Sequence, residues 1–196
     1  MSKTKEKNEH RLFVAIRLPR HLKAQLGRWI QFKRSKWAFK KWIHPQDIHI
    51  TLHFLGSTSE EKQEEIVSVL TEQCKNQDVF SLSLEGLGVF GREIQPNILW
   101  AGVRGEKQKL HQLQGKVTAS LETVGFSLES RPYHPHVTLA RKYKENGFIL
   151  PVDENPWEAM NHTWSVKDMV LYKSILGNEP MYHEVAVFPF FNEKPC

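Results

Sequence analysis

Two short stretches of this sequence share one four-residue pattern. Each lies in the last segment of a longer pattern that predicts a strand, a helix and a second strand. The first is His49-Ile-Thr-Leu52 and the second is His136-Val-Thr-Leu139. A strand-like run containing Phe13 precedes the first histidine by 36 residues, and one containing Leu99 precedes the second by 37. Helical spacing of apolar residues follows both runs. Because a repeat at a fixed period marks copies of one supersecondary unit that pack together, the sequence predicts an internal duplication.

The strands that carry these motifs are predicted to have one apolar and one polar face. Side chains alternate between the two faces of a strand, and segment 47–55 alternates in this way. On strict alternation the core face holds Ile48, Ile50, Leu52 and Phe54, and the polar face holds His49, Thr51 and His53. His136 and Thr138 share the polar face of segment 134–141 in the same manner. Each motif therefore places an imidazole and a hydroxyl side by side.

The remaining segments alternate between strand and helix patterns. Strand patterns occur at 11–18, 79–85, 97–103, 168–175 and 184–188, and helical patterns occur at 22–35, 58–74 and 110–124. Thr58, with Glu61 three residues later, has the spacing of a capping box. A chain of 196 residues has the length of one domain. We expect a flexible tail over 1–10 and a single two-lobed domain over 11–190, with internal halves of about 11–93 and 97–188.

Two histidines that meet across a pseudo-two-fold axis are suited to phosphodiester chemistry. One neutral imidazole can take a proton from attacking water, while a protonated one gives a proton to the departing oxygen. Threonine hydroxyls can donate hydrogen bonds to the non-bridging phosphate oxygens. The sequence therefore predicts His49 and His136 as the acid–base pair, with Thr51 and Thr138 as phosphate ligands.

Positive charge is concentrated at the start of the chain. Residues 1–41 hold 13 Lys and Arg against 2 Asp and Glu, whereas residues 42–196 hold 14 against 20. Aromatic side chains are interleaved with the basic ones between 28 and 41, which favours contact with a polyanion such as RNA. A solvated helix face whose aromatic residues belong to the core is the other interpretation.

Other features bound the class of protein. No run of 18 apolar residues occurs, and the first ten residues lack the apolar stretch of a secretory signal. The two cysteines, Cys74 and Cys196, fit neither a metal site nor a disulfide framework. We expect a cytoplasmic protein without membrane contact. We also expect a monomer, since no segment resembles a coiled-coil seam.

The segments around the motifs resemble a known family. Phe13-Val-Ala-Ile-Arg-Leu-Pro19, the run from His49 to Gly56 and the run from Pro135 to Arg141 are similar to signatures of the two-histidine phosphoesterase superfamily. Within it, they most resemble bacterial and archaeal RNA 2′,3′-cyclic phosphodiesterases, formerly called 2′-5′ RNA ligases. The resemblance implies an α+β fold of two pseudo-two-fold lobes, each with an antiparallel-rich sheet and helices, and an active-site cleft between the lobes.

The same resemblance implies an activity, which is the hydrolysis of a 2′,3′-cyclic phosphate to a 2′-phosphomonoester without a metal or other cofactor. His49 is the implied proton donor to the leaving 3′-oxygen, and His136 the implied acceptor that activates water. The implied substrates are RNA with 2′,3′-cyclic phosphate ends, or cyclic nucleotides.

Four neighbouring residues are further candidates for the site. Arg141 could bind a phosphate as a planar donor, although strict alternation places it on the face opposite His136. His53 could line the cleft, while Phe54 and Tyr143 could stack on a base. For His53, Phe54 and Tyr143 the competing interpretation is packing in the core or at the rim.

Three alternative functions remain open at the level of sequence. A metalloenzyme would gather His49, His53, His134 and His136 around an ion. A non-catalytic RNA-binding module would rely on the basic residues 1–41, and its affinity would fall steeply with salt. Ligation of RNA halves, such as those of tRNA, through a 2′-5′ bond is the third alternative.

Overall fold

The computed structural model describes residues 10–127, 131–151, 156–158 and 162–191. Nearly all of the expected N-terminal tail lies outside these residues. The elements are β1 (His10–Arg17), α1 (Arg20–Arg34), β2 (Phe39–Trp42), a 3₁₀ turn η1 (Pro45–Asp47), β3 (His49–Thr58), α2 (Glu60–Cys74), β4 (Phe80–Arg92), β5 (Gln95–Gly105), α3 (Lys107–Glu122), β6 (His136–Tyr143), β7 (Thr163–Val166), β8 (Asp168–Ser174) and β9 (Tyr182–Pro189).

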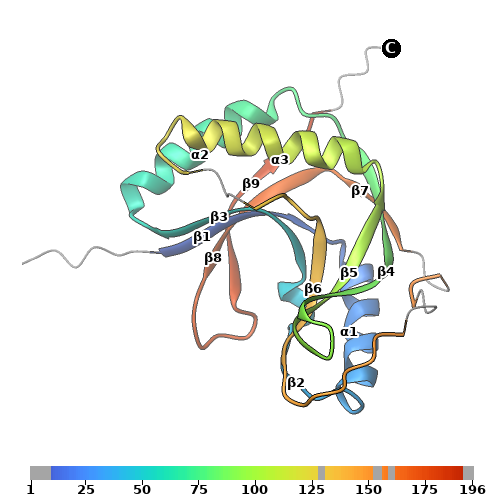
Figure 1. Cartoon of the computed structure of the whole chain (residues 1–196). Coiled ribbons are helices and arrows are strands. Elements are labelled where there is room, and N and C mark those ends of the chain that lie inside the picture. Colours follow the sequence, from blue (N-terminus) through green and yellow to red (C-terminus); the bar gives the residue numbers. More distant parts are fainter. Residues whose placement is uncertain (1–9, 128–130, 152–155, 159–161, 192–196) are drawn as a thin grey trace, which may run out of the picture.

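The described strands form one antiparallel sheet that curls around the core (Figure 1). The strand order is β7-β4-β5-β6-β3-β1-β8-β9, and β2 adds to β6. The predicted α+β fold with an antiparallel-rich sheet is confirmed, but the sheets of the two lobes are continuous through β3 and β6. Because β4 pairs with β5 while β8 pairs with β1, neither half of the sheet is built from one half of the chain alone.

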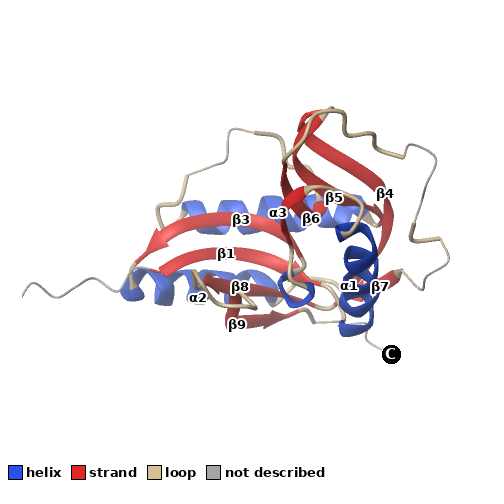
Figure 2. Ribbon diagram, turned by 90° about the horizontal axis from the view of Figure 1, so that it is seen from below, coloured by secondary structure: helices blue, strands red, loops and turns tan. Residues whose placement is uncertain are grey.

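The three helices divide between the two halves of the sheet. Helices α2 and α3 pack together and contact β9 and β3 respectively, so they cover one half (Figure 1). Helix α1 packs against β2 and η1, and Figure 2 shows it beside the half that carries β4 to β6. Its buried residues recur at helical spacing and are Leu22, Leu26, Trp29 and Ile30.

Helix α2 begins one residue later than a capping box at Thr58 implies. The side chain of Ser59 is the N-cap and accepts a hydrogen bond from the backbone N–H of Lys62. Thr58 is the last residue of β3 and is buried. The strand therefore continues through the predicted cap, and the next hydroxyl residue takes that role.

Both motif strands contain an extra residue at the same place in the repeat. On β3, Thr51 pairs with Ala15 and His53 pairs with Val14, so Leu52 has no partner of its own. On β6, Trp100 pairs with Thr138 and Leu99 pairs with Ala140, so Leu139 is the extra residue. A β-bulge of this kind interrupts the alternation of faces. The residues that follow each motif therefore point to the face opposite the one that strict alternation predicts.

Candidate active site

The register between β3 and β6 brings the two motifs together at the centre of the sheet. Ile50 pairs with Val137, and both are fully buried on the core face. The residues that flank Ile50 and Val137 therefore point to the opposite face of the sheet, where their side chains are only partly buried. Antiparallel pairing places His49 across from Thr138, and Thr51 across from His136. The four predicted residues therefore lie in one cluster.

Each histidine ring is held by the backbone two residues earlier. Nδ1 of His49 lies 2.7 Å from the carbonyl oxygen of Asp47, and Nδ1 of His136 lies 2.7 Å from that of His134. Because a carbonyl only accepts, Nδ1 is the protonated nitrogen of both rings and donates. Nε2 is then the ring nitrogen that the backbone leaves available for proton exchange. In His49 it lies 3.0 Å from Oγ1 of Thr51, whose hydroxyl donates to the neutral ring.

Aromatic rings enclose the two imidazoles from opposite sides. The His49 ring centroid lies 4.9 Å from that of Phe13, 5.2 Å from that of Tyr182 and 6.2 Å from that of Tyr172. The centroid of His136 lies 5.0 Å from that of Phe90 and 6.3 Å from that of Trp100. These rings fix the imidazoles and exclude water from their flanks.

The enclosure keeps both imidazoles neutral in the unliganded site. Burial lowers the pKa of His49 from 6.5 to about 4, against the opposing effect of its bond to Asp47, and the positive charge of Lys23 lowers it further. Burial also lowers the pKa of His136, with smaller contributions from the charges of His134 and Arg141. Near neutral pH, both rings are therefore unprotonated at one nitrogen in this structure.

The bulges bring two further residues to the catalytic face. Arg141 is two residues beyond the extra Leu139, and its charge acts on both His49 and His136. Its expected position on the face opposite His136 is therefore wrong. Phe54 is likewise two residues beyond Leu52; it is 58% exposed and its ring centroid lies 6.1 Å from that of Phe13. The expected core position of Phe54 is wrong for the same reason.

Two candidates lie away from this cluster. His53 is 4% exposed, and its Nδ1 lies 3.3 Å from Oγ1 of Thr118 on α3, so the structure does not bring it to the face of His49. The bulge at Leu52 is the cause, since it turns His53 toward the helix. Tyr143 packs with centroid distances of 5.0 Å to both Phe39 and Phe148 at the end of β6. Its surroundings are those of a packing residue.

Sequence reasoning missed Asp47, which positions the His49 side of the site. Its buried carboxylate accepts hydrogen bonds from the backbone N–H groups of Met181 and Tyr182, each at 3.0 Å. These bonds hold the start of β9 where the Tyr182 ring can meet His49. The one signal for Asp47 in the sequence was its place in the repeat. It precedes His49 by two residues, as His134 precedes His136.

The metal alternative needs four histidines in one place. His53 faces α3, apart from His49. In the part of the chain that the structure describes, no group of three or more His, Cys, Asp or Glu is arranged to hold a metal ion. No helix among the described residues is long and apolar enough to cross a membrane.

Comparisons with known proteins agree with this geometry. The sequence matches the model of the 2′-5′ RNA ligase superfamily over residues 18–174. It is 35% identical over 152 residues to an RNA 2′,3′-cyclic phosphodiesterase of Bacillus subtilis, covering 77% of this chain and 81% of the relative. It is 34% identical over 177 residues to a protein of the same name from Geobacillus stearothermophilus, covering 90% of this chain but 56% of that longer relative.

A solved structure shows the same architecture. E. coli LigT complexed with 3′-AMP superposes with a TM-score of 0.76 at 27% sequence identity. The superposition covers 93% of this chain and 99% of LigT. The curled sheet and its central pair of motif strands therefore belong to a fold that binds a nucleotide in that relative.

Proposed function

Because the chain belongs to the 2′-5′ RNA ligase superfamily, we propose that it hydrolyses RNA 2′,3′-cyclic phosphodiester ends to 2′-phosphomonoesters. It is an RNA 2′,3′-cyclic 3′-phosphodiesterase that uses two histidines and needs no metal. The observation that carries the proposal is the pairing of Ile50 with Val137, which sets both His-x-Thr motifs on one face of the sheet. Relatives named for this activity support it.

The geometry supports a single in-line displacement. Nε2 of His136 takes a proton from water, and the water oxygen forms a bond to phosphorus. The bond from phosphorus to the 3′-oxygen breaks, and Nε2–H of His49 gives its proton to that oxygen. The 2′-oxygen stays on phosphorus, so the product is a 2′-phosphomonoester. The histidine roles follow from the family resemblance; the backbone bonds at Nδ1 leave Nε2 of each ring available for them.

The remaining groups of the cluster bind the phosphate. Thr51 and Thr138 donate to its non-bridging oxygens, and Thr51 exchanges its bond to His49 for one to the substrate. Arg141 supplies a positive charge beside both rings. The exposed face of Phe54 beside Phe13 offers a surface on which the terminal base stacks.

The edge strand β2 extends positive charge away from Arg141. Lys41 pairs with Arg141 across β2 and β6, so their side chains share a face, and Lys41 is exposed. Lys33 in the last turn of α1 and Lys36 just beyond the helix lie over aromatic rings, with Nζ 4.6 Å from the Trp37 centroid and 4.0 Å from the Phe32 centroid respectively. RNA beyond the cyclic end is the partner that this arrangement suits. We also propose that the protein is a monomer and that it is cytoplasmic.

The test is product analysis with a nucleoside 2′,3′-cyclic phosphate. We expect only the 2′-phosphate, an unchanged rate in EDTA, and loss of turnover in His49→Ala and His136→Ala. A 3′-phosphate product, or activity lost to EDTA and restored by Zn²⁺, contradicts the proposed reaction. RNA binding without turnover indicates the binding module instead. Incubation of RNA halves with 5′-hydroxyl ends measures 2′-5′ ligation directly.

A further inference from the structure

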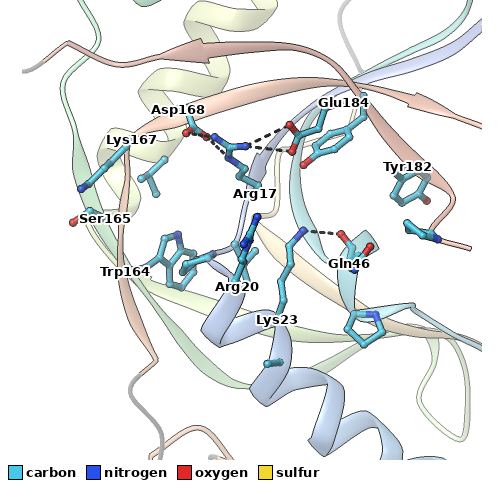
Figure 3. A pocket seen from close by; sticks show the side chains of 17 residues that line it. Arg17, Arg20, Lys23, Gln46, Trp164, Ser165, Lys167, Asp168, Tyr182 and Glu184 are labelled. Carbon is cyan, nitrogen blue, oxygen red and sulfur yellow. Dashed lines mark hydrogen bonds and ion pairs between the residues drawn. The ribbon is translucent and has the colours of Figure 1, made fainter.

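A cavity of about 880 Å³ adjoins the His49 side of the active site (Figure 3). Its walls come from the start of α1, η1, the link between β7 and β8, and β9. Arg17, which pairs with His49 across β1 and β3, is one wall residue. Tyr172 and Tyr182 line the cavity as well, and their rings contact His49. The proposed mechanism uses no group that reaches into this space.

The charges lining the cavity leave a positive surplus. Its two carboxylates, Asp168 and Glu184, both bind the guanidinium of Arg17, with the shortest nitrogen–oxygen distances 2.7 and 3.2 Å. Figure 3 shows these bonds on one side of the cavity. The carboxylates and Arg17 together carry a net charge of −1, while three more cations line the same cavity. These cations are Arg20, Lys23 and Lys167.

Two of the three further cations have no acidic partner among the described residues. Lys23 is the exception. It donates to the backbone oxygen of Gln46 at 2.6 Å, and the carboxylates of Glu184 and Asp47 act on its charge. Within the described part of the chain, neither Arg20 nor Lys167 makes an ion pair or a side-chain hydrogen bond. An anion is therefore the ligand that the electrostatics of the cavity favour.

A hydroxyl group in the cavity wall suits the same ligand. Ser165 is exposed and lines the cavity with the cations. Hydroxyl, ammonium and guanidinium groups all donate hydrogen bonds. A ligand that presents several acceptor oxygens therefore matches this lining.

We infer that this cavity binds a second phosphate group, that of the phosphodiester on the 5′ side of the nucleotide that carries the cyclic end. The inference rests on the proposed function, because only an RNA chain brings such a phosphate next to a cyclic end at His49. A 2′,3′-cyclic mononucleotide lacks it. The cavity thus selects chains over single nucleotides.

The experiment compares two substrates that share one cyclic end. Steady-state kinetics are measured with a 2′,3′-cyclic mononucleotide and with the dinucleotide ending in that same nucleotide, for the wild type and for Arg20→Ala/Lys167→Ala. The control is Lys107→Ala/Lys116→Ala, which removes two exposed charges from α3 on the face of β3 that carries His53. We expect KM for the dinucleotide to rise about tenfold for each cation removed, with kcat unchanged. Mononucleotide kinetics and the control variant should match the wild type.

A binding arm separates this inference from the proposed function. Inorganic phosphate is titrated by calorimetry into His49→Ala/His136→Ala, with and without the two cavity substitutions. We expect the cavity substitutions to remove a phosphate site even though neither protein turns over. Equal kinetic effects on both substrates, combined with loss of that phosphate site, assign the cavity to free phosphate and overturn the RNA assignment. Unchanged phosphate binding overturns the site itself, whereas a wild type that hydrolyses neither substrate overturns the proposed function alone.

Discussion

The pKa of His49 makes a specific prediction about the pH dependence of hydrolysis. In the proposed mechanism the ring must be protonated to act on the 3′-oxygen, yet burial lowers its pKa from 6.5 to about 4 in the unliganded site. At pH 7 only about one molecule in a thousand then carries this proton. The pKa of His136, the partner that must be neutral, is lowered as well. The reactive combination is therefore most abundant below pH 6.5.

Binding of the anionic substrate shifts this balance toward the protonated ring. The difference between 6.5 and about 4 corresponds to roughly 3 kcal/mol, and the negative charge of a cyclic phosphate opposes it. The profile of kcat/KM reports the free enzyme and that of kcat the bound enzyme. We expect a bell-shaped kcat/KM profile with its optimum below pH 6.5, and a kcat profile displaced to higher pH. The two limbs belong to the coupled pair of histidines.

Substitution of Lys23 tests the electrostatic origin of the effect. The charge of Lys23 lowers the pKa of His49, so Lys23→Met should move the low-pH limb of the kcat/KM profile to higher pH. Lys116→Met, an exposed position on α3, is the control. Rates are measured with a cyclic mononucleotide from pH 4 to 9 at constant ionic strength. A kcat/KM optimum above pH 7.5, or coincident kcat and kcat/KM profiles, would refute the reasoning.

Three further predictions follow from the site. His49→Ala and His136→Ala should each lower kcat by about 10²–10⁴-fold, and the double variant should lose far less than the product; near wild-type turnover in either single variant contradicts their roles. Gly88→Ala should lower both activity and stability, the latter by about 1–3 kcal/mol, because its Cβ would lie 2.1 Å from the Trp100 ring that contacts His136; chemical denaturation and turnover check this. Between pH 6.5 and about 4 the unfolded chain protonates His49 more readily than the native one, so the contribution of His49 to the free energy of unfolding should be constant above pH 6.5 and fall by about 3 kcal/mol toward pH 4. His49→Gln should remove that part of the fall, and an unchanged pH dependence of its unfolding contradicts the low pKa.

The alternation of the motifs was sufficient to place the four central residues. His49 and Thr51 precede the bulge on β3, as His136 and Thr138 precede that on β6, so a period of two holds across each pair. Beyond Leu52 and Leu139 the same period fails. An extra leucine in a strand is indistinguishable from a paired one in a single sequence, so the faces of His53, Phe54 and Arg141 could not be predicted.

The order of strands in the sheet could not be predicted from local sequence patterns, for a different reason. Strand β8 begins at Asp168 but pairs with β1, which ends at Arg17, and the ion pair between these two residues joins positions 151 apart in the chain. Pairings of this kind depend on the packing of the whole core. Asp47 was missed for the same reason, because its role depends on the backbone of Met181 and Tyr182, which lie 134 and 135 residues later.

The duplicated bulge also explains how a symmetric fold performs an asymmetric reaction. In each repeat the fifth residue after the motif histidine is turned to the catalytic face, and it is Phe54 in the first repeat and Arg141 in the second. Equivalent backbone positions therefore supply an apolar stacking surface on one side and a positive charge on the other. A cyclic nucleotide end has the same polarity, with a base on one side and an anionic phosphate on the other. In the proposed mechanism this polarity orients the substrate in one way, so that one histidine is the acid and the other the base although their backbones are related by the repeat.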